Sequence, residues 1–134
     1  MKYDEAEISE FFGVLSSEQD PEEKEFFGTT IFDYQKNNYH LSASFSIYRN
    51  DFYLDVKDIE LGEAILELRL ERVKEIGVRR DKPTSTPVLL VSALVNAVDD
   101  EKDGLRQTIQ ITLEPSICIK INNKFEWHGV GKAV

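Results

Sequence analysis

The sequence predicts a mainly β protein: an antiparallel β-sandwich or barrel of six to seven strands, with an N-terminal amphipathic helix. Three observations support this fold class. From residue 26 onward, apolar and polar residues alternate with the two-residue period of strands. Short clusters of turn-forming residues separate the alternating segments. The most apolar segment, Val88–Val98, has one wholly apolar face, as expected for a strand near the middle of a sheet.

The chain is expected to form a single domain. Its 134 residues, 41% of them hydrophobic, are enough to bury one core without disulfides. We divide it into an acidic helix and turn at 1–25, a β core at 26–128 and a frayed tail at 129–134.

Most of the net charge of −9 lies near the N-terminus. Residues 1–25 hold nine acidic residues and two lysines, whereas the rest of the chain has 16 acidic and 14 basic residues. This charge repels nucleic acid and anionic membranes and attracts a basic partner. A solvated segment that only keeps the protein soluble accounts for the same charge. Both interpretations remain open at this point.

The segment Asp4–Leu15 predicts an amphipathic helix, which Asp4 is placed to cap. Gly13 weakens that helix by about 1 kcal/mol. We expect the helix to act as a lid and to dock on the half-apolar side of the central strand. Its apolar residues follow the i, i+3, i+4, i+7 spacing of one helical face: Ile8, Phe11, Phe12 and Leu15.

Two β-hairpins are predicted after residue 25. A turn at Gln35–Asn38 joins the first two strands and would place Gly28 opposite Phe45. The next loop must contain an even number of residues, because opposed residues share a face. A two-residue turn at Asn50–Asp51 satisfies this requirement. It would pair Tyr48 with Tyr53 and Ser46 with Asp55 on the outer face.

The segment 58–80 fits two patterns. Leu66, Leu68 and Leu70 alternate with charged residues, as in a strand, but the apolar residues of the segment also gather on one helical face. We favour a strand with a bulge or bend at 72–75, because sequential elements tend to pair and the neighbours are strands. If the segment is a helix instead, Gly77 is its expected end.

The second half of the chain predicts further strands around the central one. Leu105–Leu113 forms a strand, and the turn Glu114–Ser116 leads into another. Asn122–Lys124 is expected to be a turn, and the tail around Trp127 is a candidate short edge strand. The strand after Glu114–Ser116 is expected to pack through three isoleucines: Ile117, Ile119 and Ile121.

No cofactor and no metal site is predicted. The loop Asp99–Gly104 matches the opening of an EF-hand calcium loop, but Gln110 stands where a bidentate carboxylate is needed. We therefore interpret it as an acidic surface loop. His40 and His128 do not have the spacing of metal ligands with Cys118. We expect Cys118 to be a packed, inert thiol.

The outer face of the first hairpins is the best candidate for recognition. Tyrosine beside small serines suits a binding surface, because the ring offers contact area at low entropic cost. The solvent-facing side of any stable hairpin would show the same residues. Together with the early acidic residues, the candidate partner-binding residues are Glu18, Asp20, Glu22, Glu23, His40, Tyr48, Tyr53 and Asp55.

These observations lead to a functional hypothesis: a cytoplasmic, non-enzymatic binding or inhibitor module with a basic protein partner. Its concrete form is a bacterial immunity protein that neutralises a basic toxin. No nucleic acid or membrane partner is expected. One alternative is a barrel that holds a small apolar ligand. Another is an enzyme with an unfamiliar active site.

Overall fold

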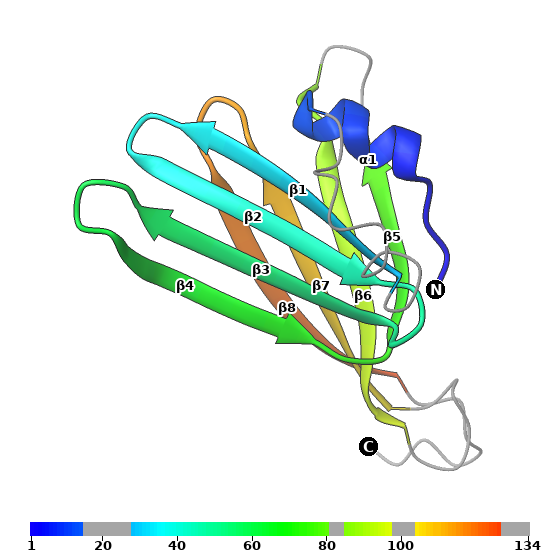
Figure 1. The fold of residues 1–134 in the computed structure, drawn as a ribbon. Helices are drawn as coiled ribbons and strands as arrows, with labels where there is room; N and C mark the ends of the chain where they lie inside the picture. Colours follow the sequence, from blue (N-terminus) through cyan, green and yellow to red (C-terminus); the bar gives the residue numbers. More distant parts are fainter. Residues whose placement is uncertain (15–27, 81–84, 98–103, 127–134) are drawn as a thin grey trace.

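The structure is a computed structural model that describes residues 1–14, 28–80, 85–97 and 104–126. In these ranges the chain forms one helix, α1 (Glu5–Phe12), and two four-stranded antiparallel sheets (Figure 1). The first sheet has the order β1-β2-β3-β4 and the second β5-β6-β7-β8. The strands are β1 (Thr29–Lys36), β2 (Tyr39–Ser46), β3 (Asp51–Asp58), β4 (Glu63–Leu70), β5 (Val73–Arg79), β6 (Val88–Ala97), β7 (Gly104–Thr112) and β8 (Cys118–Glu126).

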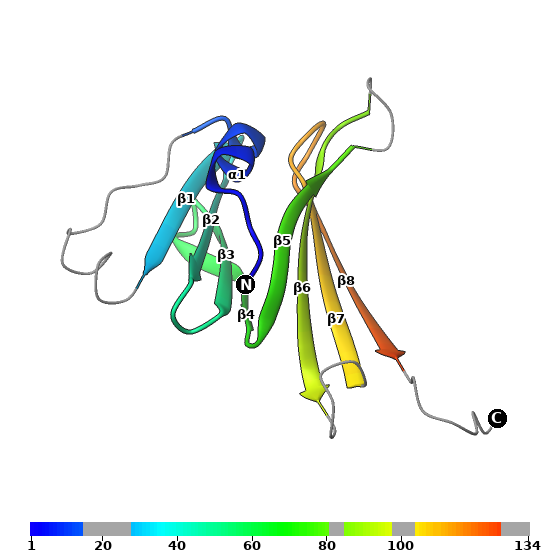
Figure 2. The same ribbon diagram turned by 90° about the vertical axis from the view of Figure 1, so that its right-hand side faces the viewer.

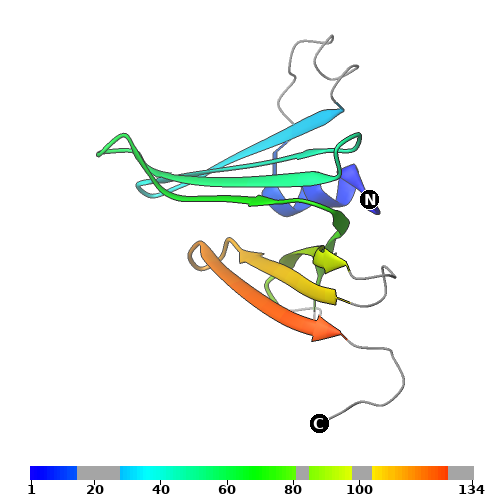
Figure 3. The ribbon, with the colours of Figure 1, turned by 90° about the horizontal axis from the view of Figure 1, so that it is seen from below.

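The two sheets lie in separate layers (Figure 3), and their strands cross at an angle in Figure 1. The prediction of a mainly β antiparallel fold is confirmed, and the arrangement is a sandwich rather than a closed barrel. The described residues form eight strands instead of six or seven, partly because the segment 58–80 forms two. In the same ranges, no helix is long and apolar enough to cross a membrane.

The β1–β2 turn has two residues, Asn37 and Asn38, and not the predicted four. Asn37 has φ 55°, a left-handed conformation that asparagine tolerates in tight hairpins. The shorter turn moves the register by two residues, so that Thr30 and not Gly28 lies opposite Phe45. The predicted pairing of Gly28 is therefore wrong, although the same residues face the core.

The β2–β3 connection has four residues, Ile47–Asn50, in place of the predicted two-residue turn. The backbone N–H of Ile47 donates to the carbonyl of Gly28 at 3.1 Å. The carbonyl of Asn50 accepts from the N–H of Val73 at 2.8 Å. These contacts engage backbone groups that a longer β2–β3 ladder would use. Tertiary structure therefore outweighs the local turn preference here.

The four-residue connection changes which residues face each other on the outer surface. Ser46 lies opposite Asp51, so the predicted pairing of Ser46 with Asp55 is wrong. The predicted Tyr48–Tyr53 pair is also wrong, because Tyr48 lies in the connection and only Tyr53 is on the sheet. The even loop length is preserved, which is why the core-facing residues within β2 and β3 were assigned correctly.

The segment 58–80 is extended and bends at the predicted place, and it is not a helix. β4 ends at Leu70, β5 begins at Val73, and Arg72 between them has φ 56°. A register shift between Val73 and Glu75 marks the start of β5 as irregular. The bend does more than interrupt a strand: it moves the chain from the edge of the first sheet to the edge of the second.

β6 is an interior strand of the second sheet, between β5 and β7, as predicted for the most apolar segment. Leu89, Val91 and Ala93 on its inner face are fully buried. Ile109 and Ile111 of β7 are directly opposite β6 residues and are buried as well. The apolar run thus forms the centre of one wall of the core.

β8 is an edge strand and is more exposed than the sequence predicts. Ile117 just before β8 and Ile119 within it are only half-buried, and Ile121 is 43% exposed. The predicted turn at Asn122–Lys124 is wrong, because these residues continue β8 and pair with β7. Cys118 is exposed, which corrects the prediction of a packed thiol. An edge strand has a single neighbour, so less of its surface is covered.

α1 is shorter than the predicted helix. The carboxylate of Asp4 accepts hydrogen bonds from backbone N–H groups of the first turn, as predicted for its cap. Gly13 ends the helix with φ 69° and donates its N–H to the carbonyls of the last turn. Ile8 and Phe12 are buried. Leu15, the turn expected at the end of the segment 1–25 and the tail from residue 127 onward lie outside the described residues.

α1 covers the gap between the two sheets beside β1 and β5 (Figure 2). The ring of Phe12 stacks on Phe32 of β1 with centroids 5.4 Å apart, and Phe32 lies 6.4 Å from Phe45. The predicted docking on the central strand is wrong, because β5 occupies the position beside β6 and α1 packs mainly against the edge strands β1 and β5. The helix therefore closes one side of the core.

Candidate functional site

The outer face of the first sheet is the candidate functional site. Along β1–β4, the residues that alternate with the buried core residues point away from the second sheet, and the strand register sets them in rows. We call this surface the polar sheet face. It comprises Asp33, His40, Ser42, Ser44, Tyr53, Asp55, Lys57, Glu67 and Arg69.

One row of the polar sheet face is acidic and crosses all four strands. Asp33 on β1 lies opposite Ser42 on β2. Asp55 on β3 lies between Ser42 and Glu67 on β4. We call these four residues the acidic row. Like charges that lie directly opposite each other destabilise a sheet, so the Asp55–Glu67 pair works against folding.

Nearby basic side chains compensate the acidic row only in part. His40 Nε2 lies 3.3 Å from Asp33 Oδ1, and Lys57 Nζ lies 3.9 Å from Asp55 Oδ2. Both pairs are partly exposed, and such contacts contribute little to stability. Asp55 Oδ1 is buried and has no hydrogen-bond partner, and no group in the described part of the chain pairs with Glu67. Uncompensated negative charge therefore remains on β3 and β4.

Arg69 is the cation nearest to this charge along β4, but other groups hold it. Its Nη2 lies 3.4 Å from the buried carboxylate of Asp51 and 3.6 Å from Glu71. The guanidinium carbon lies 5.1 Å from the centre of the Tyr53 ring, which is a cation–π distance. Arg69 is thus directed away from Glu67 and towards the neighbouring row.

A hollow of about 420 Å³ lies over β3 and β4 at the end of the acidic row. Backbone and side chains of both strands form it, with the two carboxylates on one side and the arginine–tyrosine pair on the other. The hollow can accept a side chain that approaches the carboxylates from outside. Its lining residues are Tyr53, Leu54, Asp55, Glu67, Leu68 and Arg69.

The structure brings together three of the sequence-predicted site residues. His40, Tyr53 and Asp55 all lie on the polar sheet face. Tyr48 does not join them: it is 63% exposed in the β2–β3 connection, and its ring packs near Gly28. The other four candidates, Glu18, Asp20, Glu22 and Glu23, fall outside the described residues.

Sequence reasoning missed Asp33, Glu67 and Arg69 as members of this surface. Each stands at an outward position of an alternating segment, which was a usable signal. What was missing was the register, because only the pairing of β3 with β4 places Glu67 opposite Asp55. The uncertain assignment of the segment 58–80 hid that relationship.

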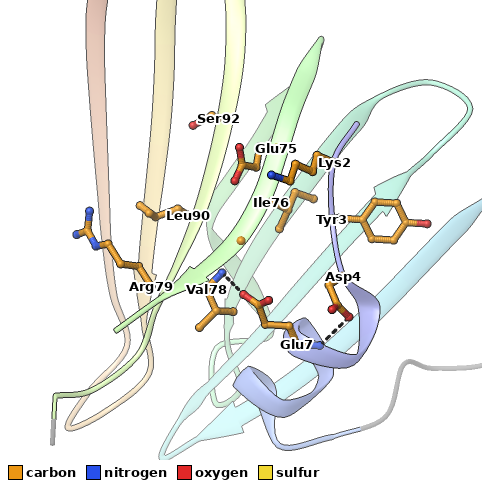
Figure 4. Close-up of a pocket in the computed structure, with 11 residues that line it drawn as sticks. Lys2, Tyr3, Asp4, Glu7, Glu75, Ile76, Val78, Arg79, Leu90 and Ser92 are labelled. Carbon is orange, nitrogen blue, oxygen red and sulfur yellow. Dashed lines mark hydrogen bonds between the residues drawn. The ribbon is translucent and has the colours of Figure 1, made fainter. Parts of the chain in front are cut away.

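Some acidic residues near the N-terminus have structural roles. Lys2 forms a parallel bridge with Glu75, so the first residues extend the edge of β5. In Figure 4, Glu7 reaches across and accepts a hydrogen bond of 2.7 Å from the N–H of Val78. Asp4 caps α1, as described above. These two carboxylates are engaged with the backbone and are less available to a partner than the sequence suggests.

The groove in Figure 4 has a volume of about 610 Å³ and lies between this N-terminal segment and β5–β6. Asp4, Glu7 and Glu75 line it together with Lys2 and Arg79. Charges of both signs are mixed in this groove, in contrast to the acidic row. It does not contain any of the sequence-predicted site residues.

Within the ranges that the structure describes, no three histidine, cysteine or carboxylate side chains form a cluster that could hold a metal ion. The predicted acidic loop that begins at Asp99 lies outside those ranges except for Gly104, which begins β7. That prediction is not tested by the structure.

The fold has a counterpart among solved structures. A chain of the contact-dependent growth inhibition toxin–immunity protein complex from Klebsiella pneumoniae 342 matches with a TM-score of 0.71. The match covers 92% of this chain and 96% of that chain, with 16% sequence identity. The two chains share a fold. No protein-family model and no curated protein sequence matches this chain.

Proposed function

We propose that this protein is a non-enzymatic inhibitor that binds a basic protein toxin, as an immunity protein does, in the cytoplasm. In this proposal the partner is a protein and neither nucleic acid nor a membrane. Inhibition requires only that a stable surface covers the toxin, so no catalytic group is needed.

The acidic row carries this proposal. Asp55 and Glu67 keep negative charge close together although the sheet would be more stable without one of them. A cationic side chain from a partner that meets the exposed Oδ2 of Asp55 and the carboxylate of Glu67 would remove that repulsion. Charge complementarity of this kind directs association and selects a basic partner. The net charge of −9 of the whole chain acts in the same direction at longer range.

The shared fold with a chain of a toxin–immunity protein complex supports the same class of function. The alternative of a barrel around an apolar ligand has no comparable support. The sheets are separate, a core of buried side chains packs between them, and the 610 Å³ groove lies outside them.

The test uses the product of the gene adjacent to the one that encodes this chain. We expect that product to arrest growth when expressed alone and to be harmless when this protein is co-expressed. Titration calorimetry should show a complex that weakens when salt is raised from about 50 mM to about 500 mM, because exposed charge pairs are screened. A neighbouring product that is neither toxic nor bound would contradict the proposal.

A pair of isosteric variants tests the surface. Asp55→Asn with Glu67→Gln removes charge without changing shape, and we expect affinity to fall about tenfold or more. Glu10→Gln removes an exposed acidic residue from α1 and is the control, with little expected change. An equal loss of binding free energy per removed charge in both variants would mean that only total charge matters and that the acidic row is not the site.

A further inference from the structure

β4 differs from the other strands of the first sheet in how little of it is covered. In the described part of the chain it pairs with β3 alone. Its outward residues are exposed, and two inward residues, Leu66 and Leu68, are only half-buried. Their partners on β3, Val56 and Leu54, are buried. An open edge with apolar residues beside it is a position where another strand can add.

Exposed apolar side chains gather along this edge. Ile65 is 56% exposed, and Leu61 in the β3–β4 turn is 68% exposed. Beside β4, a hollow of about 180 Å³ opens between the two sheets. An apolar side chain could enter it from the β4 edge and would be covered by both sheets. The hollow is lined by Tyr39, Val56, Ile65, Leu66, Ile117 and Ile119.

The charge along β4 decides which strand would fit. Four acidic residues lie on β4 and the adjoining turns, and Arg69 there is already held by Asp51 and Tyr53. Natural sheets often protect an exposed edge with lysine, whereas this edge is acidic. A second copy that added through its own β4 would bring like charges together. The four acidic residues are Glu60, Glu63, Glu67 and Glu71.

We propose that the β4 edge docks an extended segment of a basic protein partner, which adds to the first sheet as a fifth strand. A lysine or arginine of that segment lies opposite Glu67, at the next position in line with the acidic row. Apolar residues on its other face cover Leu66 and Leu68 and fill the hollow. This inference rests on the basic partner of the proposed function, and it adds the edge, the binding mode and an alternating basic–apolar sequence in the partner.

The experiment uses the full chain and a synthetic eight-residue peptide of alternating lysine and valine. Nuclear magnetic resonance should show shift changes at Glu63–Leu70 and slower amide exchange in that strand when the peptide is added. A glutamate–valine peptide is the control and should not bind. Shift changes centred on β8 or on the Figure 4 groove, binding of both peptides, or no binding would each overturn the proposal.

Two variants refine the test. Glu63→Gln with Glu67→Gln should weaken peptide binding about fivefold or more, since both charges line the docking edge. Glu10→Gln on α1, which removes an exposed acidic residue outside the docking edge, is the control and should leave binding nearly unchanged. Lys120 is exposed on β8. If sedimentation shows a dimer that Lys120→Glu abolishes, β8 of a second copy occupies the β4 edge and the proposal is wrong.

The outcomes separate this inference from the proposed function. If the peptide binds at β4 but the neighbouring gene product is harmless, the docking edge is supported and a toxin is not the partner. If this protein rescues cells from a toxin but amide exchange in β4 is not slowed when the toxin binds, the proposed function holds. The β4 edge is then not the docking site.

Discussion

Gly28 lies directly against Ile47: a Cβ added to Gly28 would come within 2.6 Å of Ile47 Cγ1. Gly28 also has φ 58°, which favours glycine. The contact joins the start of β1 to the β2–β3 connection, where the carbonyl of Gly28 accepts the Ile47 N–H. This close approach is part of what ends the β2–β3 ladder at Ser46.

Replacement of Gly28 by alanine should therefore destabilise the protein by more than the backbone strain of a left-handed alanine alone. We expect Gly28→Ala to lower the free energy of unfolding by about 2–4 kcal/mol, from the left-handed φ together with the clash. Gly62→Ala is the matched control, because Gly62 has φ 67° but open space around its Cβ position. It should cost about 1–2 kcal/mol. Urea denaturation measures both, and equal losses would show that Ile47 simply moves aside.

Docking of α1 should depend on one of its two adjacent phenylalanines. Phe12 is buried and stacks on Phe32, whereas Phe11 is half-buried. We expect Phe12→Ala to lower the free energy of unfolding by about 3–4 kcal/mol and Phe11→Ala by clearly less. Denaturation curves test the difference. A larger loss for Phe11→Ala would mean that α1 packs through another face.

A contact between the sheets should make stability depend on pH. Lys36 donates to the Glu114 carboxylate, and Tyr34 donates to it at 3.3 Å. The hydrogen bond from Lys36 is the main reason that the pKa of Glu114 is lowered from its ordinary value of 4.5. A lowered folded pKa gives stability that is present above pH 4.5 and lost as the pH falls through the folded value.

Glu114→Gln should remove that dependence. We expect the wild type to be the more stable of the two above the ordinary pKa and the difference to shrink steadily in acid. Urea denaturation at a series of pH values measures it. A difference that grows in acid would have the wrong sign and would mean that the carboxylate is not stabilised by Lys36.

The two ion pairs of β3 should differ in strength. Asp51 is buried where Arg69 meets it, whereas Asp55 and Lys57 are both partly exposed and 3.9 Å apart. A double-mutant cycle with alanine should give a coupling energy of about 1–2 kcal/mol for Asp51–Arg69 and below about 0.5 kcal/mol for Asp55–Lys57. The reverse order would indicate that Asp55 is compensated within the protein, which would weaken the case for the acidic row.

The amino-acid sequence by itself determined most of the strands and which side of them faces the core. Alternation identified the inward residues Phe32, Leu41, Leu54 and Ile111, all of them buried. The apolar face of Val88–Val98 identified an interior strand. Asp4 was recognised as a helix cap because its carboxylate can bond to N–H groups in the next turn. These features depend on neighbours within a few residues.

Only the tertiary structure decided the strand register and the point at which the chain passes from the first sheet to the second. A period of two is unchanged when strands slide by two or four residues, so the pattern that placed Asp55 outward could not place Glu67 opposite it. The lengths of the turns depended on long-range contacts such as Gly28 with Ile47. Nothing in the sequence around Arg72 indicates that the bend there leads the chain into the second sheet. The acidic row exists because distant segments meet, and alternation alone does not encode that meeting.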